Sequence, residues 1–220
     1  GWESFVGAGP IPMRHGLTLG ELGHWFIDHF KLNVDYHVVE MQGYDPNEGP
    51  GFGWPSDERI WINPSPNAAN LNMARAYAGT VMLEGTTLSE GRGTTRPLEI
   101  FGAPDIDADA VLAEMHKRAP QWLQGCILRP IWFEPTFHKH QGKLCQGLQI
   151  HVDHPSYNHH EFRPWRLMAL AFKAIRSIDP DYPLWRDFAY EYEHDRLAID
   201  LINGSPLLRE WVDDATAAPE

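Results

Sequence analysis

Residues 84–97 read Glu-Gly-Thr-Thr-Leu-Ser-Glu-Gly-Arg-Gly-Thr-Thr-Arg-Pro. This short stretch holds two carboxylates, two guanidinium groups, five hydroxyls and three glycines. No helical or alternating period fits it, so the sequence predicts a loop that the surrounding fold holds in place. The glycines permit tight bends or a close approach of the backbone to a ligand.

The charged side chains of this loop allow two interpretations. Arg92 and Arg96 carry planar guanidinium groups that suit a carboxylate or a phosphate. Together with hydroxyls and acids, they are typical of a site for a polyhydroxylated, acidic small molecule. The same composition also fits an ordered surface loop tied by internal salt bridges, because structural ion-pair networks resemble binding sites. Both interpretations stay open at this point.

The composition limits the class of protein. A length of 220 residues allows one large domain or two small ones, and 43% hydrophobic residues with 9 Trp indicate a folded globular chain. A net charge of −12 without a basic stripe disfavours nucleic acid and anionic membranes as partners. The longest apolar runs fall far below the ~18 residues that span a bilayer. Cys126 and Cys145 could form a disulfide across neighbouring strands or remain buried free thiols.

The first secondary-structure signal is a capping box. Thr18 and Glu21 stand at the spacing at which each side chain caps the other residue's backbone amide, so a helix is expected over 18–30. The apolar run 36–41 predicts a buried strand. This order suggests the end of an α/β layer. The irregular connection 43–66 contains Trp54 and Trp61, either of which could stack on a sugar or pack in the core.

Later elements follow from helix caps and apolar runs. A helix capped by Asp107 and one beginning at Pro164 are the clearest. Helices are expected over 71–78, 108–118, 164 to about 178, 197–202 and 206–212, strands over 80–83, 127–133 and 147–152, and a loose end over 215–220.

Six stretches carry a resemblance to a known family. They are Ser4–Gly7, Pro12–Glu21, Pro64–Asn67, Tyr77–Thr94, Pro97–Pro104 and Cys145–His151. Taken together and in this order, they resemble the exo-β-N-acetylmuramidase family of peptidoglycan-recycling glycoside hydrolases, long known as a domain of unknown function. The likeness covers nearly the whole chain, and residues 84–94 are its most specific part.

The resemblance implies an α/β fold with two domains. Residues 1–65 would form the tail of a Rossmann-like catalytic domain, and residues 66–220 a smaller α+β domain that closes the cleft. The first part of the catalytic domain would be absent from this chain, and the missing N-terminal half or a complementing chain would be a partner. The resemblance also suggests a periplasmic or secreted bacterial protein, although the chain opens without a signal segment.

The implied activity is release of N-acetylmuramic acid from the non-reducing end of peptidoglycan fragments, without a cofactor. Two catalytic glutamates would be needed, Glu21 and one in the absent half. At the third position of a capping box, the helix dipole favours the ionised form of Glu21, which suits a base or a nucleophile more than a general acid. From the residues alone, capping is the favoured role for this side chain, and the resemblance reverses this preference.

The resemblance also implies a set of substrate-binding residues. Glu84 and Glu90 are expected to orient Arg92 and Arg14, and the arginines to bind the lactyl carboxylate of the sugar. His15 could bind the substrate or hold a tight turn. The full set is Arg14, His15, Asn67, Glu84, Ser89, Glu90, Arg92, Thr94 and Arg96, and it is expected to face the same hollow as Glu21.

Two rival functions stay open. The first is a module that binds glycans or a partner chain without catalysis. The second, weaker one is a metal-dependent hydrolase built on the histidines. Their spacing is scattered and lacks a His-Glu-x-x-His motif, so no metal is expected. The histidines concerned are His138, His140, His151, His154, His159 and His160.

Overall fold

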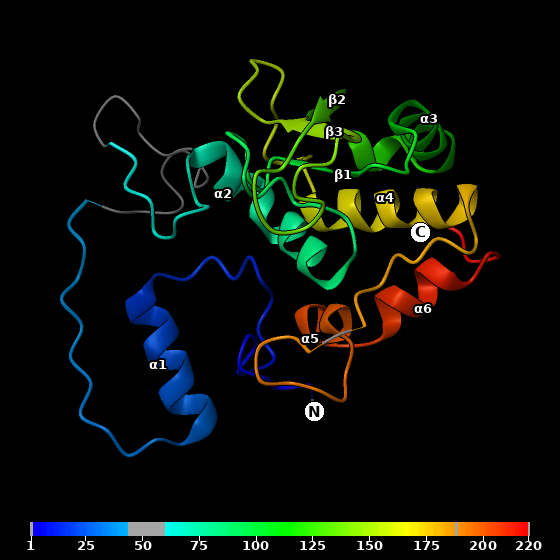
Figure 1. Ribbon diagram of the computed structural model, residues 1–220. Coiled ribbons are helices and arrows are strands. Elements are labelled where there is room, and N and C mark those ends of the chain that lie inside the picture. Colours follow the sequence, from blue (N-terminus) through cyan, green and yellow to red (C-terminus); the bar gives the residue numbers. More distant parts are fainter. Residues whose placement is uncertain (1, 44–59, 188, 220) are drawn as a thin grey trace. The chain divides into compact units, whose positions relative to one another are not determined.

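The computed structural model describes residues 2–43, 60–187 and 189–219 (Figure 1). The chain forms two compact units, one of residues 11–55 and the other of residues 1–10 together with 56–220. The described residues contain both helices and a small sheet, so the chain has a mixed α/β fold. The Rossmann-like arrangement and the boundary at residue 65 stay predictions.

The unit of residues 11–55 contains helix α1, Leu19–Phe30. The predicted capping box is confirmed. The Glu21 amide donates to the Thr18 hydroxyl at 3.2 Å, and the Thr18 amide donates to the Glu21 carboxylate at 2.7 Å. Aromatic rings at helical spacing stack along the helix, as between Trp25 and His29, whose ring centroids lie 4.7 Å apart. Local signals therefore determine where this helix begins.

The strand predicted over residues 36–41 is wrong. These residues form no strand and are exposed, Val39 to 96%. A strand needs the backbone of a partner, and the strands of the described residues pair with one another in the other unit. An apolar run alone does not supply that partner.

The other unit contains an antiparallel sheet in the order β1-β3-β2. Strand β2, Ile127–Phe133, matches its prediction, and β3, Cys145–His151, begins two residues before the predicted start at residue 147. Strand β1, Ile100–Ala103, was not predicted. Gly102 lies opposite Gly147 in the register, and a Cβ on Gly147 would come 1.8 Å from a backbone oxygen of β1. This close approach explains why a short strand contains a glycine.

Helices lie beside and below this sheet in the view of Figure 1. Those expected from caps and periodicity are present with shifts of one or two residues. The α-helices are α2, Leu71–Thr80; α3, Ala108–Arg118; α4, Pro164–Ile178; α5, Ala198–Asn203; and α6, Leu207–Asp213. Two 3-10 helices are η1, Val81–Gly85, and η2, Pro120–Leu123.

The strand predicted over residues 80–83 is also wrong. Residues Val81–Gly85 form η1, and the Thr86 amide closes its last turn by donating to the Leu83 carbonyl at 2.9 Å. A short apolar run that continues directly from a helix has no periodicity that separates a strand from a tighter helical turn.

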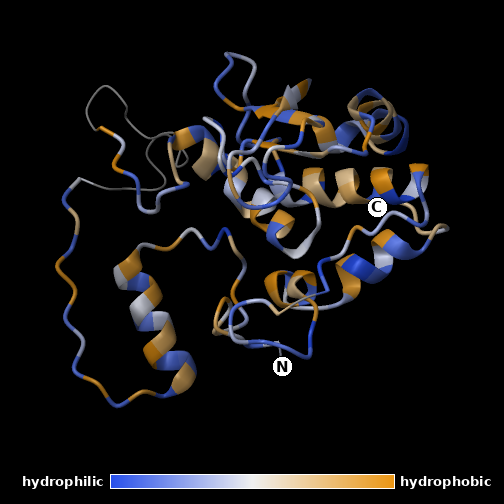
Figure 2. Ribbon diagram, in the orientation of Figure 1, coloured by the Kyte–Doolittle hydropathy of each residue, from blue (hydrophilic) through white to orange (hydrophobic). Residues whose placement is uncertain are grey.

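Helix α4 is the centre of the core. Its residues 167–175 are all buried, and it packs against α2, α3 and α6. Figure 2 shows α4 as one of the more hydrophobic helices of the chain. Its Phe172 shares one apolar cluster with Phe101 of β1 and Leu148 of β3. This core supports the loop that follows η1 and leads into β1.

The structure also bears on membrane-spanning helices, on the two cysteines and on the C-terminal residues. None of the helices in the described parts of the chain is long and apolar enough to cross a membrane. Cys126 and Cys145 are free thiols, and burial raises the pKa of Cys126 to about 12. The expected loose end makes contacts, since Trp211 Nε1 donates to the Ala218 carbonyl at 3.2 Å.

Candidate functional site

The predicted loop of residues 84–97 begins with the last two residues of η1, and the remainder is irregular and is held in place as predicted. Ser89 and Gly102 of β1 exchange two backbone hydrogen bonds of 2.8 and 3.1 Å, and the Thr87 amide donates to Leu184 at 2.8 Å. The Ser89 hydroxyl accepts from the Gly91 amide at 3.1 Å, and the Thr94 hydroxyl donates to the Gly91 carbonyl at 2.6 Å. Two of the predicted substrate-binding hydroxyls therefore stabilise turns of the loop itself.

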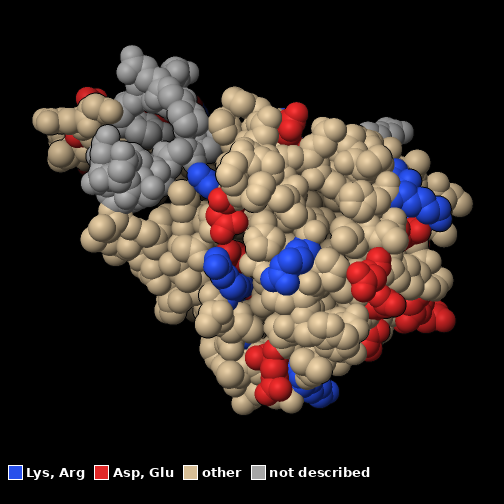
Figure 3. Space-filling model, turned by 90° about the horizontal axis from the view of Figure 1, so that it is seen from above, with Lys and Arg blue, Asp and Glu red and all other residues tan. Residues whose placement is uncertain are grey.

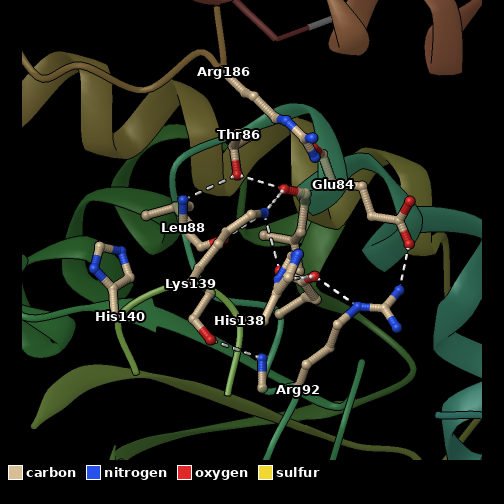
Figure 4. Close-up of polar contacts among 12 residues, drawn as sticks. Glu84, Thr86, Leu88, Arg92, His138, Lys139, His140 and Arg186 are labelled. Carbon is tan, nitrogen blue, oxygen red and sulfur yellow. Dashed lines mark hydrogen bonds and ion pairs between the residues drawn. The ribbon is translucent and has the colours of Figure 1, made fainter. Parts of the chain in front are cut away.

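Arg92 lies at the centre of the loop and contacts both glutamates that were expected to orient it, Glu84 and Glu90 (Figure 4). Its Nη2 lies 2.6 Å from Glu84 Oε1, and its Nε lies 2.8 Å from Glu90 Oε1. Burial lowers the pKa of Arg92, but the charges of Glu84 and Glu90 outweigh this effect and raise it. The Arg92 side chain is still 22% exposed. Both glutamates thus orient Arg92, and the internal salt bridges of the second interpretation are present.

Glu90 is fully buried, and Lys139 and His138 contact it in addition to Arg92. Lys139 Nζ lies 3.0 Å from Glu90 Oε2, and His138 Nδ1 lies 3.3 Å from Glu90 Oε1. Burial raises the pKa of this carboxyl group, but the charge and hydrogen bond of Lys139 and the charge of His138 outweigh it, so the pKa of Glu90 is lowered. Glu90 is therefore an ionised group inside the protein.

Lys139 was missed by the sequence analysis. Besides Glu90, its Nζ donates to the Leu83 carbonyl at 2.7 Å and to the Leu88 carbonyl at 3.0 Å (Figure 4). Burial lowers the pKa of Lys139, Glu90 opposes this effect, and the nearby charge of Arg186 lowers the pKa further. A lysine between two histidines in a loop gives no sequence signal for such a role.

Glu84 is held from a distant part of the chain. The Tyr190 hydroxyl donates to Glu84 Oε2 at 2.7 Å, and Arg186 Nη1 donates to the Glu84 carbonyl at 3.3 Å. Burial, together with the hydrogen bond to Glu84, raises the pKa of Tyr190 well above its ordinary value. The Arg186 guanidinium lies 5.3 Å from the centroid of the Tyr190 ring. Arg186 and Tyr190 therefore complete the surroundings of Glu84, and we define the ionic cluster as Glu84, Glu90, Arg92, Lys139 and Arg186.

A small, open hollow lies beside Tyr190. We call it the Tyr190 hollow. Phe5 and Tyr192, which line it, are 72% and 78% exposed, and their rings meet edge to face with centroids 5.0 Å apart. The residues lining it are Ser4, Phe5, Val6, Tyr190, Glu191, Tyr192, Glu193 and Leu201.

Arg96 does not contact the ionic cluster. Its Nη1 lies 3.1 Å from Glu99 Oε2, and Asn70 Nδ2 donates to Glu99 Oε1 at 2.6 Å. The Asn70 side chain also caps α2 by accepting from the Met73 amide at 2.9 Å. Arg96 thus supports the start of a helix. Asn67 lies partly exposed in the turn that precedes α2.

Arg14, His15 and Glu21 belong to the unit of residues 11–55. His15 Nδ1 accepts from the Leu17 amide at 3.0 Å, as expected of a histidine in a tight turn. Glu21 is exposed, and its hydrogen bonds with the backbone and side chain of Thr18 lower the pKa of its carboxyl group. The approach of these three residues to Arg92 stays a prediction.

The histidines singled out in the sequence have separate partners. His140 Nε2 lies 2.9 Å from the Thr87 carbonyl oxygen, and His154 Nδ1 lies 2.8 Å from the Ser156 hydroxyl. Within the described ranges, no three His, Cys, Asp or Glu side chains are grouped so as to hold a metal ion.

The irregular connection of residues 43–66 contains two tryptophans, Trp54 and Trp61. Trp54 lies outside the described residues. Trp61 is partly buried, and its Nε1 donates to the Ala68 carbonyl at 2.9 Å. This contact gives Trp61 a structural role.

Two family models match this chain. The model described as exo-β-N-acetylmuramidase NamZ, N-terminal, matches residues 1–72, and the corresponding C-terminal model matches residues 75–220. The expected absence of an N-terminal half is not supported, because both models match residues of this chain.

Among characterised proteins, the chain is similar to the peptidoglycan β-N-acetylmuramidase NamZ of Bacillus subtilis (strain 168). The two are 33% identical over 98% of this chain and 48% of the relative. The chain therefore spans about half the length of that protein.

Two solved structures share the fold, both crystal structures of DUF1343 family proteins from Bacteroides fragilis NCTC 9343. The first has a TM-score of 0.77 and 24% identity, and covers 97% of this chain and 53% of that protein. The second has a TM-score of 0.66 and 22% identity, and covers 99% of this chain and 53% of that protein. On the strength of the two family models, the chain belongs to the exo-β-N-acetylmuramidase NamZ family.

Proposed function

We propose that this chain is part of an exo-β-N-acetylmuramidase, an enzyme that releases N-acetylmuramic acid from the non-reducing end of peptidoglycan fragments. The observation that carries the proposal is the 33% identity, over 98% of the chain, to a protein named as a peptidoglycan β-N-acetylmuramidase. Membership of the family supports a glycosidase, and the ionic cluster supports an anionic sugar as its substrate.

The chemistry assigns different roles to the carboxylates. Cleavage of a glycosidic bond proceeds through an oxocarbenium-like transition state and normally uses two carboxyl groups. Glu21 is our candidate for one of them. Since its hydrogen bonds with Thr18 lower the pKa, it suits the role of a base or nucleophile rather than of a general acid. Glu84 and Glu90 orient Arg92 and do not react, because each is engaged by cations of the cluster.

Arg92 is our candidate for binding the lactyl carboxylate of the sugar. An arginine has five N–H donors. Within the described part of the chain, Arg92 donates hydrogen bonds through its Nε and Nη2 nitrogens and not through Nη1. The cluster holds the cations Arg92, Lys139 and Arg186 against the anions Glu84 and Glu90, so its net charge is 3 − 2 = +1. A chain of net charge −12 thus places local positive charge where an anionic ligand needs it. The face seen in Figure 3 carries both basic and acidic side chains, with a group of acidic ones on its right.

The Tyr190 hollow provides apolar surface close to Glu84. The aromatic rings of Phe5 and Tyr192 are largely exposed there. Sugar rings present apolar C–H faces, for which aromatic side chains are suitable partners. We propose that a sugar bound to Arg92 extends into this hollow.

The test is hydrolysis of a chromogenic N-acetylmuramic acid glycoside by the protein and by its Glu21→Gln variant. A glutamine retains the hydrogen bond of the capping box, so the variant should fold normally. We expect the wild type to release the chromophore and the variant to lose this activity. Full activity of Glu21→Gln would rule out a catalytic role for this carboxylate.

A second candidate function is a module that binds glycans without cleaving them. It is favoured by one observation, namely that the Glu21 carboxylate is already engaged in an exposed capping box. Calorimetry with N-acetylmuramic acid separates the two functions. Binding without turnover supports the module, and turnover supports the enzyme.

The division into domains is proposed on the same basis. We assign residues 1–65 to a Rossmann-like catalytic domain and residues 66–220 to a smaller α+β domain. The transition between the two family models at residues 72–75 supports a boundary in this region.

A further inference from the structure

We propose that Lys139 is a positioning residue for substrate binding, because it fixes the Glu90 carboxylate that in turn orients the guanidinium group of Arg92. This inference rests on the proposed function, in which Arg92 binds the carboxylate of a muramoyl sugar. Lys139 would not touch the substrate itself. It would act through a chain of two contacts, from Lys139 to Glu90 and from Glu90 to Arg92.

The first argument is the geometry of the loop that carries Lys139. This loop, residues 135–142, is joined to loop 84–97 on both sides of Lys139. Thr136 donates to the Gly93 carbonyl from its amide at 3.1 Å and from its hydroxyl at 2.8 Å. On the other side, His140 contacts the Thr87 carbonyl oxygen at 2.9 Å. The two loops are therefore joined by hydrogen bonds, and Lys139 lies between the two points at which they are joined.

The second argument is backbone conformation. His138 and His140 have φ angles of 70° and 57°, so both neighbours of Lys139 are in the left-handed region. Such a conformation costs a residue with a side chain about 1–2 kcal/mol. It persists where surrounding contacts impose it, and it is common at functional sites. Here it directs Lys139 inward, towards Glu90 (Figure 4).

The third argument is charge. Lys139 Nζ is surrounded by three oxygen acceptors, those of Leu83, Leu88 and Glu90. A buried carboxylate is stable only while cations and hydrogen bonds compensate for its lost hydration. Without the ammonium group, Glu90 would keep the guanidinium group of Arg92 and the imidazole ring of His138 as neighbours, and the net charge of the cluster would fall from +1 to 0. Arg92 would then serve to neutralise Glu90 instead of presenting positive charge to a ligand.

The experiment compares Lys139→Met with Lys143→Met. Lys143 is an exposed lysine directly after this loop, so its substitution removes the same charge without touching Glu90. Kinetics are measured with chromogenic glycosides of N-acetylmuramic acid and of N-acetylglucosamine, which lacks the lactyl carboxylate. We expect Lys139→Met to raise KM for the muramic substrate about tenfold while kcat changes less than about threefold. Neither substrate should distinguish Lys143→Met from the wild type.

The second substrate separates positioning from general damage. A purely structural role of Lys139 would impair both glycosides equally. Positioning of Arg92 impairs the substrate that carries the carboxylate and leaves the substrate without it little changed. Equal loss on both substrates, or no loss, overturns the proposal.

A measurement without substrate tests the inference independently of the proposed function. In the wild type, the Nε–H proton of Arg92 donates to the buried Glu90 and should exchange slowly with water in NMR spectra. In Lys139→Met it should exchange at least about tenfold faster. If the wild type neither binds nor cleaves muramic glycosides, the proposed function fails, and this proton still decides the role of Lys139. If Lys139→Met does not fold, fast exchange of this proton in the wild type would overturn the inference and slow exchange would support it.

Discussion

Gly93→Ala is the most informative perturbation of the paired loops. Gly93 has a φ angle of 79°, and a Cβ atom there would lie 2.6 Å from Phe137 N and 2.7 Å from Thr136 N. These are backbone atoms, so the clash cannot be relieved by rotation of a side chain. The 135–142 loop would have to move away from the 84–97 loop, and both hydrogen bonds from Thr136 to the Gly93 carbonyl would lengthen or break.

The magnitude follows from three contributions. A left-handed alanine costs about 1–2 kcal/mol. Loss of two hydrogen bonds costs about 1 kcal/mol each. The reduced entropy of the unfolded chain returns about 0.4–1 kcal/mol. The sum predicts that Gly93→Ala lowers the free energy of unfolding by about 3 kcal/mol, which corresponds to a decrease in Tm of roughly 6–12 °C for a chain of this size.

Gly142→Ala, in the 135–142 loop, is the matched control. Gly142 has a φ angle of 69°, but a Cβ atom there would have no neighbour within 4 Å. This variant should show only the backbone contributions and lose about 1 kcal/mol, roughly 2 kcal/mol less than Gly93→Ala. Urea unfolding followed by tryptophan fluorescence measures both variants. Equal losses, within about 0.5 kcal/mol, would refute the claim that the two loops are in contact at Gly93.

Two further predictions concern buried polar groups. Glu90→Gln should lower the free energy of unfolding at neutral pH by about 3 kcal/mol, because it leaves buried cations without their anion. Since the folded-state pKa of Glu90 is lowered, its stabilisation is present above the unfolded-state value of about 4.3 and is lost as the pH falls through the folded value. The difference between wild type and variant in urea unfolding should therefore shrink in acid, and a constant difference would contradict this. Asn70→Ala should cost about 2 kcal/mol, because it removes a helix cap and a partner of Glu99, whereas Asp107→Ala removes only an exposed cap and should cost about 1 kcal/mol. Equal losses in thermal unfolding would contradict the role of Asn70 in the Glu99 pair.

The parts of the fold that the sequence predicted well are those specified by neighbouring residues. The capping box of Thr18 and Glu21 and the cap at Asp107 act within one helical turn, so they can be recognised without tertiary information. Strands 36–41 and 80–83 were predicted wrongly, because a strand also depends on a partner that an apolar run does not specify. Strand β1 was missed for the same reason, since its partner β3 lies more than 40 residues further along the chain.

The candidate site divides in the same way. Contacts of Arg92 with Glu84 and Glu90 connect residues at most eight positions apart, and the composition of the loop was sufficient to predict them. Lys139 and Tyr190 reach the same loop from 49 and 106 positions away, respectively from Glu90 and Glu84. Only the packing of the whole unit brings these side chains together, and neither has a sequence signal of its own.

The two interpretations of loop 84–97, a binding site or an internally paired loop, are compatible. A guanidinium group held by two carboxylates has already lost its rotamer freedom, so a ligand that binds to its remaining donors loses less entropy on association. The same carboxylates would cancel its charge if they were the only other charged groups. Lys139 and Arg186 restore a net positive charge of the cluster, so Arg92 can be both oriented and attractive to an anion. A preorganised anion site therefore requires a salt-bridge network with one more cation than it has anions. Removal of the Lys139 ammonium group should impair binding of the anion before it impairs folding.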